Sequence, residues 1–554
     1  MFRDGHQPLA GRALLLAGGE PEPSSKTQPE AASPLISLGG DLWEAELVPR
    51  RIGPHRIVVE GWTDRGPIGT GPVDAPDLTA SEPSLLWVDR ERALVGAWYE
   101  LFPRSFGGFR GVEARAREIA AMGFDVLYLP PIHPIGVTAR KGPNNALVAG
   151  PDDPGSPWAI GSREGGHLSI HPDLGTVDDF VHLVDEVNAN GMEVALDYAL
   201  QCSPDHPWVL EHPEWFHHRP DGTIACAENP PKVYQDIYPL NFWPPTERDR
   251  VAMWEACKGI LDYWISLGVR IFRVDNPHTK PIAFWEWVIA EVQKDHPDVV
   301  FLAEAFTRPR VMARLAEAGF SQSYTYFTWR TEQHGEEGLW AYLEELARGP
   351  AADYMRPNFW PNTPDILAGP LRNGPPSAFA LRLVLAATMS PSYGVYSGYE
   401  LYENVPASDQ SEEYLNSEKY EIKRRDYSRP DSLAPLMSRL NDVRRRHPAL
   451  SRLRSIRFHP TTNPQVIAYS KQSDDREDAV LTVVNLDPLG PQEASIGLDL
   501  HALGLPLERP YKVVDELSGE CFDWFGADPF VRLDPSTRVA HVFDLRNDGD
   551  VEQW

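Results

Sequence analysis

Cysteine is scarce in this chain: its 554 residues include only Cys202, Cys226, Cys257 and Cys521. Their spacing matches no zinc-ligand pattern, and nothing in the sequence assigns a disulfide between any two of them. No calcium-loop pattern is present either. We therefore expect reduced thiols, a cytoplasmic location, and no metal ion or other cofactor.

Long apolar runs and an excess of positive charge are also lacking. No apolar stretch approaches the length of a membrane span, and the segment 13–17 is too short and poorly flanked to be a secretory signal. Lys and Arg total 52 against 80 Asp and Glu, which gives a net charge of −28. Because phosphate backbones need a basic surface, this balance argues against nucleic acid as a partner, and an anionic substrate must be met by local donors.

The length and the local patterns indicate several domains. A chain of 554 residues exceeds one hydrophobic core, so two to four domains are expected. Residues 1–95 favour a β domain, because 41–47 and 56–62 alternate apolar and polar residues around a Gly-Pro turn. The Gly- and Pro-rich stretch 66–84 is typical of a linker. Residues 451–554 return to alternation, which predicts a C-terminal antiparallel β domain.

Between these ends, residues 96–450 alternate strand and helix patterns. The eight strand signals lie at about 97–102, 125–129, 193–200, 268–276, 299–304, 320–327, 355–360 and 393–399. Helix signals separate them, including one capped by Thr176 and ended near Gly191. Long insertions occur at about 132–170 and 201–250. The pattern predicts an α/β fold, a (β/α)8 TIM barrel with a loop domain after strand three.

Two of the predicted strands end in carboxylates. Asp275 follows the apolar residues of 268–276, and Glu304 ends 299–304; one helix with two loops fills the interval between them. Adjacent parallel strands present their carboxyl ends at the same edge of the barrel, so the two side chains should face one cleft. Arg273 and Asp275 alone could form a structural ion pair. With Glu304 added, the pair of acids is better explained by glycosyl transfer, which uses two carboxyl groups.

Three short stretches resemble signature regions of the α-amylase superfamily. They are Phe-Arg-Val-Asp at 272–275, Ala-Glu at 303–304 and Asn-Thr-Pro-Asp at 362–365. The chain departs from the common pattern in two places: the stretch 197–206 stands after strand three, where Asn-His is usual, and Pro364 precedes Asp365, where His is usual. Together with 98–105, 140–145 and 229–236, these departures resemble the bacterial α-1,4-glucan:maltose-1-phosphate maltosyltransferases.

The resemblance implies a reaction and a role for each matching residue. Such enzymes transfer maltosyl units from α-maltose 1-phosphate to the non-reducing end of α-1,4-glucan, with retention and release of phosphate. By resemblance, Asp275 is the nucleophile, Glu304 the acid and base, and Asp365 the group that stabilises the distorted sugar. The implied substrate-binding residues are Arg273, which pairs with Asp275; Lys141, Asn145, Gln201 and Lys419, which bind sugar hydroxyls; and Asn229, Tyr234 and Asn276, which bind phosphate.

The chain also differs from the family that it resembles. Those enzymes carry a longer N-terminal β domain and a helical-bundle insertion that contribute to homodimer contacts, so the resemblance leaves dimerisation open. Two other functions stay open: an α-glucan hydrolase or transglycosidase without a phosphorylated donor, and a non-catalytic carbohydrate-binding barrel. The presence of all three acids disfavours the second, and the neutral anion site of Asn229, Tyr234 and Asn276 disfavours the first.

Overall fold

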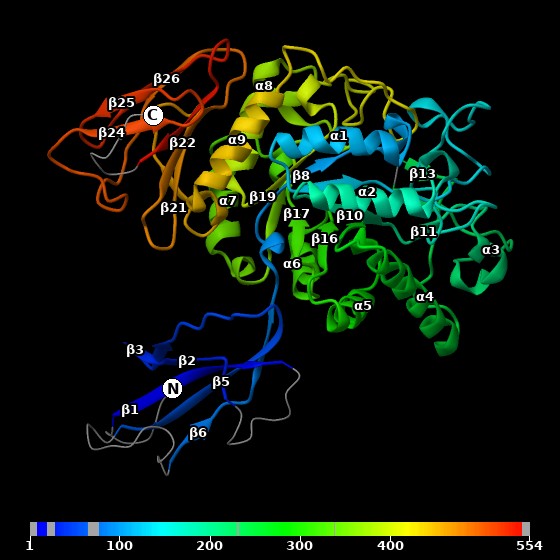
Figure 1. Cartoon of the computed structure of the whole chain (residues 1–554), viewed down its shortest axis with the longest axis horizontal. Helices are drawn as coiled ribbons and strands as arrows, with labels where there is room; N and C mark the ends of the chain where they lie inside the picture. Colours follow the sequence, from blue (N-terminus) through cyan, green and yellow to red (C-terminus); the bar gives the residue numbers. More distant parts are fainter. Residues whose placement is uncertain (1–7, 19–27, 65–76, 230–231, 337, 546–554) are drawn as a thin grey trace. The chain divides into compact units, whose positions relative to one another are not determined.

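The computed structural model describes residues 8–18, 28–64, 77–229, 232–336 and 338–545 (Figure 1). The chain forms two compact units, one of Met1–Arg92 with Glu291–Val299 and one of Ala93–Ala290 with Val300–Trp554. Most of the predicted linker lies outside the described residues. Within the described ranges, no helix has both the length and the apolar character that crossing a membrane requires.

The N-terminal unit contains an antiparallel sheet. Its strands are β1 (Leu9–Ala17), β2 (Ala31–Pro34), β5 (Gly53–Thr63), β6 (Thr79–Ala80) and β7 (Ser84–Val88), in the order β2-β1-β5-β6 with β7 also paired to β5. Leu14, Leu16 and Val58 form its small core. The predicted strand at 41–47 is shorter, since β4 (Leu42–Glu44) pairs only with β3 (Ile36–Gly39), and β6 falls inside the predicted linker.

The predicted TIM barrel is confirmed. Its eight parallel strands close into a ring in the order β10-β15-β16-β17-β18-β19-β8-β9. They are β8 (Gly96–Glu100), β9 (Val126–Leu129), β10 (Glu193–Tyr198), β15 (Ile271–Asp275), β16 (Val300–Glu304), β17 (Gln322–Tyr324), β18 (Pro357–Phe359) and β19 (Ser392–Tyr396). Alternate residues such as Trp98, Tyr128 and Ile271 fill the interior with apolar and aromatic side chains.

Helices connect the barrel strands and surround them (Figure 1). They are α1 (Phe109–Ala121), α2 (Val177–Ala189), α4 (Glu247–Ser266), α5 (Ile282–Asp295), α6 (Pro309–Glu317), α7 (Leu339–Arg348) and α8 (Pro376–Met389), and α9 (Ala434–Arg446) follows β19. The predicted cap of α2 is present, because Thr176 and Asp179 exchange side-chain and backbone hydrogen bonds. Gly191, just past this helix, has a positive φ of 77° that ends it.

Three insertions follow barrel strands at their carboxyl ends. The first, after β9, includes the short helical turn Pro143–Asn145. The second, after β10, contains α3 (Pro207–Glu211) and two small ladders, β11 (Gln201–Cys202) with β14 (Tyr238–Pro239) and β12 (Ala227–Asn229) with β13 (Lys232–Tyr234). The third spans residues 397–433 between β19 and α9. These insertions carry most of the predicted substrate-binding residues.

The C-terminal residues form antiparallel sheets, as predicted. The larger sheet has the order β20-β21-β22-β27-β24-β25. Its strands are β20 (Arg457–His459), β21 (Val466–Gln472), β22 (Ala479–Asn485), β24 (Tyr511–Asp515), β25 (Cys521–Trp524) and β27 (Ala540–Asp544), and a separate pair joins β23 (Gln492–Ser495) to β26 (Phe530–Leu533). Val466, Leu481, Val513 and Phe543 belong to the core. The domain boundaries at 95 and 450 stay predictions.

Candidate active site

Asp275 and Glu304 end adjacent barrel strands and are direct neighbours in the parallel ladder of β15 and β16. Both side chains are buried, with exposed fractions of 6% and 8%. The strand stops at Asn276, whose φ of 42° turns the chain before Pro277. This turn lets the Asn276 backbone N–H donate to Glu304 Oε2 at 3.2 Å. The sequence-predicted pair of acids is therefore brought together at one edge of the barrel.

Arg273 contacts both acids. Its Nη1 donates to Asp275 Oδ1 at 3.0 Å and to Asp197 Oδ2 at 2.9 Å, and its Nη2 lies 3.2 Å from Glu304 Oε1. Burial opposes the charge of this guanidinium, but the surrounding carboxylates outweigh burial and hold its pKa well above the usual value. Arg273 is therefore a fixed cation that orients three carboxyl groups.

Burial gives Glu304 the character of an acid at neutral pH. Removal from water raises the pKa of its carboxyl to about 8; the Arg273 guanidinium opposes this shift, while the negative charges of Asp275 and Asp365 add to it. Asp275 Oδ1 accepts hydrogen bonds from Arg273 and, at 3.5 Å, from Asn276 Nδ2. A carboxyl that keeps its proton beside an oriented second carboxyl is the division of roles that retaining glycosyl transfer uses.

The third acid, Asp365, lies in the turn after β18 and forms an ion pair with Lys419. Burial alone would raise the pKa of Asp365, but the Lys419 ammonium outweighs burial, so the pKa lies below its usual value. Lys419 is itself buried and lies 3.5 Å from Glu413 Oε1. This pair joins the loop after β18 to the 397–433 insertion.

Two further predicted residues lie on the same side of the site. Tyr234, on β13, is half-buried, and burial raises the pKa of its phenol. The charges of Lys419 and Asp365 also influence this pKa, so the phenol lies close to both groups. Lys141 is buried and donates to Gln235 Oε1, one residue after Tyr234. Both side chains therefore come from insertions that meet over the barrel end.

Of the remaining predicted residues, Gln201 and Asn145 form no hydrogen bond to the acids within the described part of the chain. Gln201 Nε2 donates to the Trp158 carbonyl at 3.4 Å. Asn145 has a φ of 64°, and its buried Oδ1 has no hydrogen-bond partner among the described residues. Asn229 ends β12, where its backbone pairs with Lys232, but its side chain lies outside the described residues.

Several polar groups around the acids were not identified from the sequence. Asp197, the penultimate residue of β10, accepts a hydrogen bond from the Tyr128 hydroxyl at 2.5 Å, and burial raises the pKa of its carboxyl to about 7 despite the Arg273 charge. Lys280 Nζ donates to the backbone carbonyl of Asp275 at 3.0 Å. Glu100 ends β8, is 2% exposed, and its Oε2 has no partner among the described residues. A carboxylate at or near the end of an apolar strand run, the signal that located Asp275, was also available for Asp197 and Glu100.

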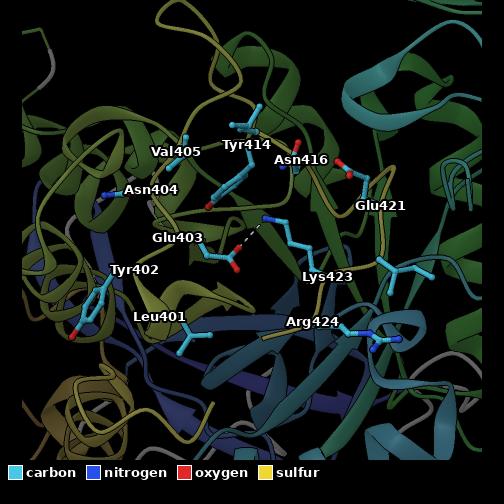
Figure 2. Close-up of a pocket in the computed structure, with 12 residues that line it drawn as sticks. Leu401, Tyr402, Glu403, Asn404, Val405, Tyr414, Asn416, Glu421, Lys423 and Arg424 are labelled. Atoms are coloured by element: carbon cyan, nitrogen blue, oxygen red, sulfur yellow. Dashed lines mark hydrogen bonds and ion pairs between the residues drawn. The ribbon is translucent and has the colours of Figure 1, made fainter. Parts of the chain in front are cut away.

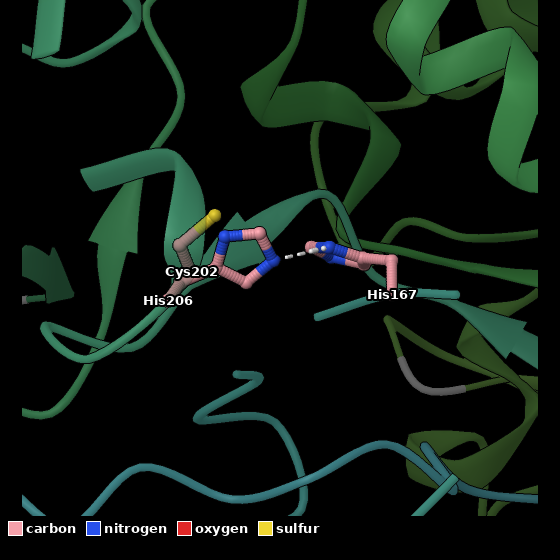
Figure 3. A group of neighbouring side chains, drawn as sticks. All are labelled: His167, Cys202 and His206. Carbon is pink, nitrogen blue, oxygen red and sulfur yellow. Dashed lines mark hydrogen bonds between the residues drawn. The ribbon is translucent and has the colours of Figure 1, made fainter. Parts of the chain in front are cut away.

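Three buried side chains, His167, Cys202 and His206, are close enough to suggest a metal site (Figure 3). The histidine nitrogens are, however, hydrogen-bonded in a chain. The backbone N–H of Trp208 donates to His206 Nδ1 at 3.1 Å, so the proton of the neutral His206 ring is on Nε2. His206 Nε2 therefore donates to His167 Nδ1 at 3.0 Å. His167 Nε2 then donates to the Ala199 carbonyl at 3.0 Å. With burial lowering both histidine pKa values, to about 4 and about 2, the group supports the loop after β10 as neutral rings.

Comparison with known proteins gives matches along nearly the whole chain. A family model described as "Alpha-1,4-glucan:maltose-1-phosphate maltosyltransferase, domain N/S" matches residues 1–67, and one described as "GLGE, C-terminal" matches residues 458–545. An alpha-1,4-glucan:maltose-1-phosphate maltosyltransferase of Streptomyces coelicolor is 59% identical over 480 residues, which cover 85% of this chain and 70% of the relative. The enzyme of that name from Mycobacterium tuberculosis is 50% identical over 483 residues, covering 84% and 68%.

Solved structures agree on the fold. An alpha-amylase from Lactobacillus plantarum matches with a TM-score of 0.62 at 19% identity, covering 82% of this chain and all of that structure. A maltogenic alpha-amylase from Thermotoga neapolitana matches with a TM-score of 0.63 at 18% identity and the same coverage. The extent of the sequence identity shows that the chain belongs to the α-1,4-glucan:maltose-1-phosphate maltosyltransferase family.

Proposed function

We propose that this protein transfers maltosyl units from α-maltose 1-phosphate to the non-reducing end of an α-1,4-glucan and releases phosphate, with retention at the anomeric carbon. The single observation that carries the proposal is the contact of one guanidinium, that of Arg273, with both Asp275 and Glu304 at neighbouring strand ends. Membership of the family supports the choice of donor and acceptor.

In the first step, an Asp275 carboxylate oxygen attacks the anomeric carbon of the donor. The bond from that carbon to the phosphate oxygen breaks, its electrons go to the phosphate, and Glu304 gives its proton to the departing oxygen. The pKa of Glu304, raised to about 8 by burial, keeps this proton available at neutral pH. The product of the step is a β-maltosyl ester of Asp275.

In the second step, the acceptor 4-hydroxyl attacks the same carbon. Glu304 takes the hydroxyl proton, and the bond to Asp275 breaks, which restores the free carboxylate and the α configuration. We assign to Asp365 the hydroxyls of the reacting sugar, since its ion pair with Lys419 fixes its position. Lys141, Asn145, Gln201 and Lys419 are proposed to bind the remaining donor hydroxyls.

The phosphate is proposed to lie against Asn229, Tyr234 and Asn276. These are neutral donors, so they can orient the anion without the strong attraction that a cationic site would exert on the product. The Lys419 ammonium also lies nearby, but it is already paired with Asp365 and Glu413. Its charge is therefore balanced, which supports the assignment of the phosphate to neutral donors. We also propose the domain division 1–95, 96–450 and 451–554 and a cytoplasmic location, which the four free cysteines support.

The test is an assay of free phosphate after incubation with maltose 1-phosphate and glycogen. Glu304→Gln should bind donor but release phosphate very slowly, and Asp275→Ala should form no covalent adduct with a fluorinated donor. Arg457→Ala, which breaks an exposed pair with Asp499 in the C-terminal sheet, is the matched control and should behave as the unaltered protein. Glucan cleavage without any phosphate release would contradict the proposal and favour a hydrolase or transglycosidase.

A further inference from the structure

The turn that ends β15 has a left-handed backbone. Asn276 has a φ of 42° and a ψ of 55°, a conformation that costs free energy for any residue with a side chain, although Asn adopts it more readily than most. The ladder between β10 and β15 ends at the pair Tyr198 and Val274, one residue before Asp275. On the β10 side the turn therefore lies beyond the ladder, and other contacts must hold it.

Lys280 holds the peptide group that meets the catalytic acid. The carbonyl of Asp275 and the N–H of Asn276 belong to one peptide group, which is planar, so the two turn together. Lys280 Nζ donates to this carbonyl at 3.0 Å, and the N–H donates to Glu304 Oε2 at 3.2 Å. A hydrogen bond on one edge of the peptide plane therefore fixes the direction of the donor on the other edge.

A second hydrogen bond from the same ammonium completes the support of the turn. Lys280 Nζ also donates to the Asn276 carbonyl at 3.2 Å, to which the Thr279 hydroxyl donates at 2.8 Å. The ammonium therefore holds the carbonyls on both sides of the Asn276 Cα, and with them both torsions of the turn. The Trp285 indole N–H holds the next carbonyl, that of Pro277, at 2.9 Å, but this carbonyl lies beyond both torsions.

Lys280 differs in this respect from two lysines of the 397–433 insertion. Lys423 Nζ pairs with Glu403 Oε2 at 3.1 Å beside a surface cavity, as Figure 2 shows, and Lys419 pairs with Asp365. Within the described part of the chain, both hydrogen bonds of the Lys280 ammonium go to backbone carbonyls instead. Its direct contacts therefore act on the shape of the turn rather than on a carboxylate.

The charge of Lys280 and the hydrogen bond that it supports act on Glu304 in the same direction. Burial lowers the pKa of the Lys280 ammonium, and the carboxylates of Asp275, Glu304 and Asp197 oppose this shift and favour the charged form. This cation and the Asn276 N–H both favour the ionised form of Glu304. The other groups that act on Glu304 are Arg273, Asp275 and Asp365; Arg273 also acts on Lys280, and Lys280 on Cys257 of α4.

We propose that Lys280 is a positioning residue for the transfer: through the left-handed turn, its ammonium holds the Asn276 N–H on Glu304 and the Asn276 side chain toward the phosphate. The support of the turn stands on its geometry, and the link to phosphate departure rests on the proposed function. Asp275 depends less on Lys280, because its side chain pairs with Arg273 and its backbone with Glu304. Lys280 therefore serves the departure of phosphate more than the attack by Asp275.

The test compares two donors, maltose 1-phosphate and α-maltosyl fluoride, in the full-length protein and in Lys280→Met. Fluoride needs little help from an acid in order to leave, and no contact with it is assigned to Asn276. In the variant, kcat/KM for maltose 1-phosphate should fall about tenfold or more, the effect of losing a hydrogen bond to a charged group. The value for the fluoride should change far less, whereas a general loosening of the site would lower both equally.

Three further measurements sharpen the comparison. In Lys280→Met the alkaline limb of phosphate release should move to higher pH, because both losses favour protonated Glu304. Thr279→Val, at an exposed position, removes one donor from the Asn276 carbonyl and should lower kcat/KM about threefold, again for the phosphate donor only. Lys258→Met, which breaks a pair with Asp262 within α4, is the matched control and should behave as the unaltered protein.

The outcomes separate this proposal from the proposed function. Equal losses with both donors, or an alkaline limb that stays in place or moves to lower pH, would overturn the positioning role. A crystal structure of Lys280→Met in which Asn276 keeps its φ near 42° and its N–H stays on Glu304 would overturn it as well. Absence of phosphate release from the unaltered protein would instead refute the proposed function, and the crystal structure would still decide whether Lys280 holds the turn.

Discussion

Raising the pH should switch off donor cleavage by removing the proton of Glu304. Burial raises the pKa of this carboxyl to about 8, with Asp275 and Asp365 adding to the shift and Arg273 opposing it. Because the departing phosphate takes this proton, kcat/KM for maltose 1-phosphate should be level below about pH 8. Above that pH it should fall about tenfold per unit, since the acid form declines by that factor.

The substitution Asp365→Asn provides a quantitative test of the electrostatic cause of the raised Glu304 pKa. It removes a negative charge that raises the pKa of Glu304, and it leaves the Lys419 ammonium with the more distant Glu413 carboxylate as its counter-charge, which lowers the pKa of Glu304 further. The alkaline limb should therefore move to lower pH, by about one unit or less for a charge at this range. The level of activity should also fall, because Asp365 is assigned to the reacting sugar.

The assay is initial phosphate release at constant ionic strength between about pH 6 and 9.5, with sub-saturating donor. The phosphate of the donor titrates identically in both proteins, so the difference between their profiles reports on the protein. A limb that moves to higher pH in Asp365→Asn would refute the electrostatic reasoning. A limb that survives in Glu304→Gln would show that another group supplies the proton.

Three further predictions concern buried charges. Burial raises the pKa of Glu100 well above its usual range, so Glu100→Gln, a neutral replacement, should leave the alkaline limb of the phosphate-release profile in place; a shift of that limb to lower pH would mean that Glu100 is ionised. Burial opposes the charge of His447, but its hydrogen bond to Asp478 at 2.7 Å raises the pKa to about 9. Its stabilisation, roughly 1–3 kcal/mol, is present below pH 6.5 and lost as the pH rises through about 9, so the loss of stability in His447→Gln should shrink over that interval in thermal melts. Burial lowers the pKa of Lys471 well below 10.5, which favours unfolding at neutral pH because the unfolded chain binds the proton. Lys471→Met should therefore raise Tm at pH 7, offset in part by the unpaired Leu450 carbonyl, and an unchanged difference near pH 10.5 would contradict this cause.

The barrel and its paired acids could be predicted from the sequence for a local reason. Each strand is a short apolar run, and the interval between Asp275 and Glu304 holds a single helix with its loops. A unit of that length places consecutive strands side by side, so two carboxylates at strand ends must meet. The apolar runs and the helix cap at Thr176 are likewise readable from neighbouring residues alone.

The contacts around the acids depend on closure of the barrel and could not be predicted in that way. Arg273 reaches Asp197 because β10 and β15 pair, although a long insertion separates them in the chain. The contact of Asp365 with Lys419 joins two loops, and its existence depends on how both fold. In the N-terminal part, the alternation at 41–47 indicated a strand with one apolar and one polar face. It could not show whether other residues pack on the apolar face, and Leu42 is in fact 61% exposed.

The sharing of one guanidinium by three acids has a consequence for redesign. If the nucleophile is deleted, as in Asp275→Gly, Arg273 retains only Asp197 and Glu304 as partners, and the repulsion between the two catalytic carboxyls disappears. Both changes favour the ionised form of Glu304. We expect such a variant, supplied with an activated β-maltosyl fluoride, to deprotonate an acceptor hydroxyl at a lower pH than the parent does, because the ionised form of Glu304 is the base. The deletion that turns this scaffold into a glycan-building catalyst would therefore also lower its working pH. A rate that rises with pH only near 8, the pKa of Glu304 in the parent, would argue against that coupling.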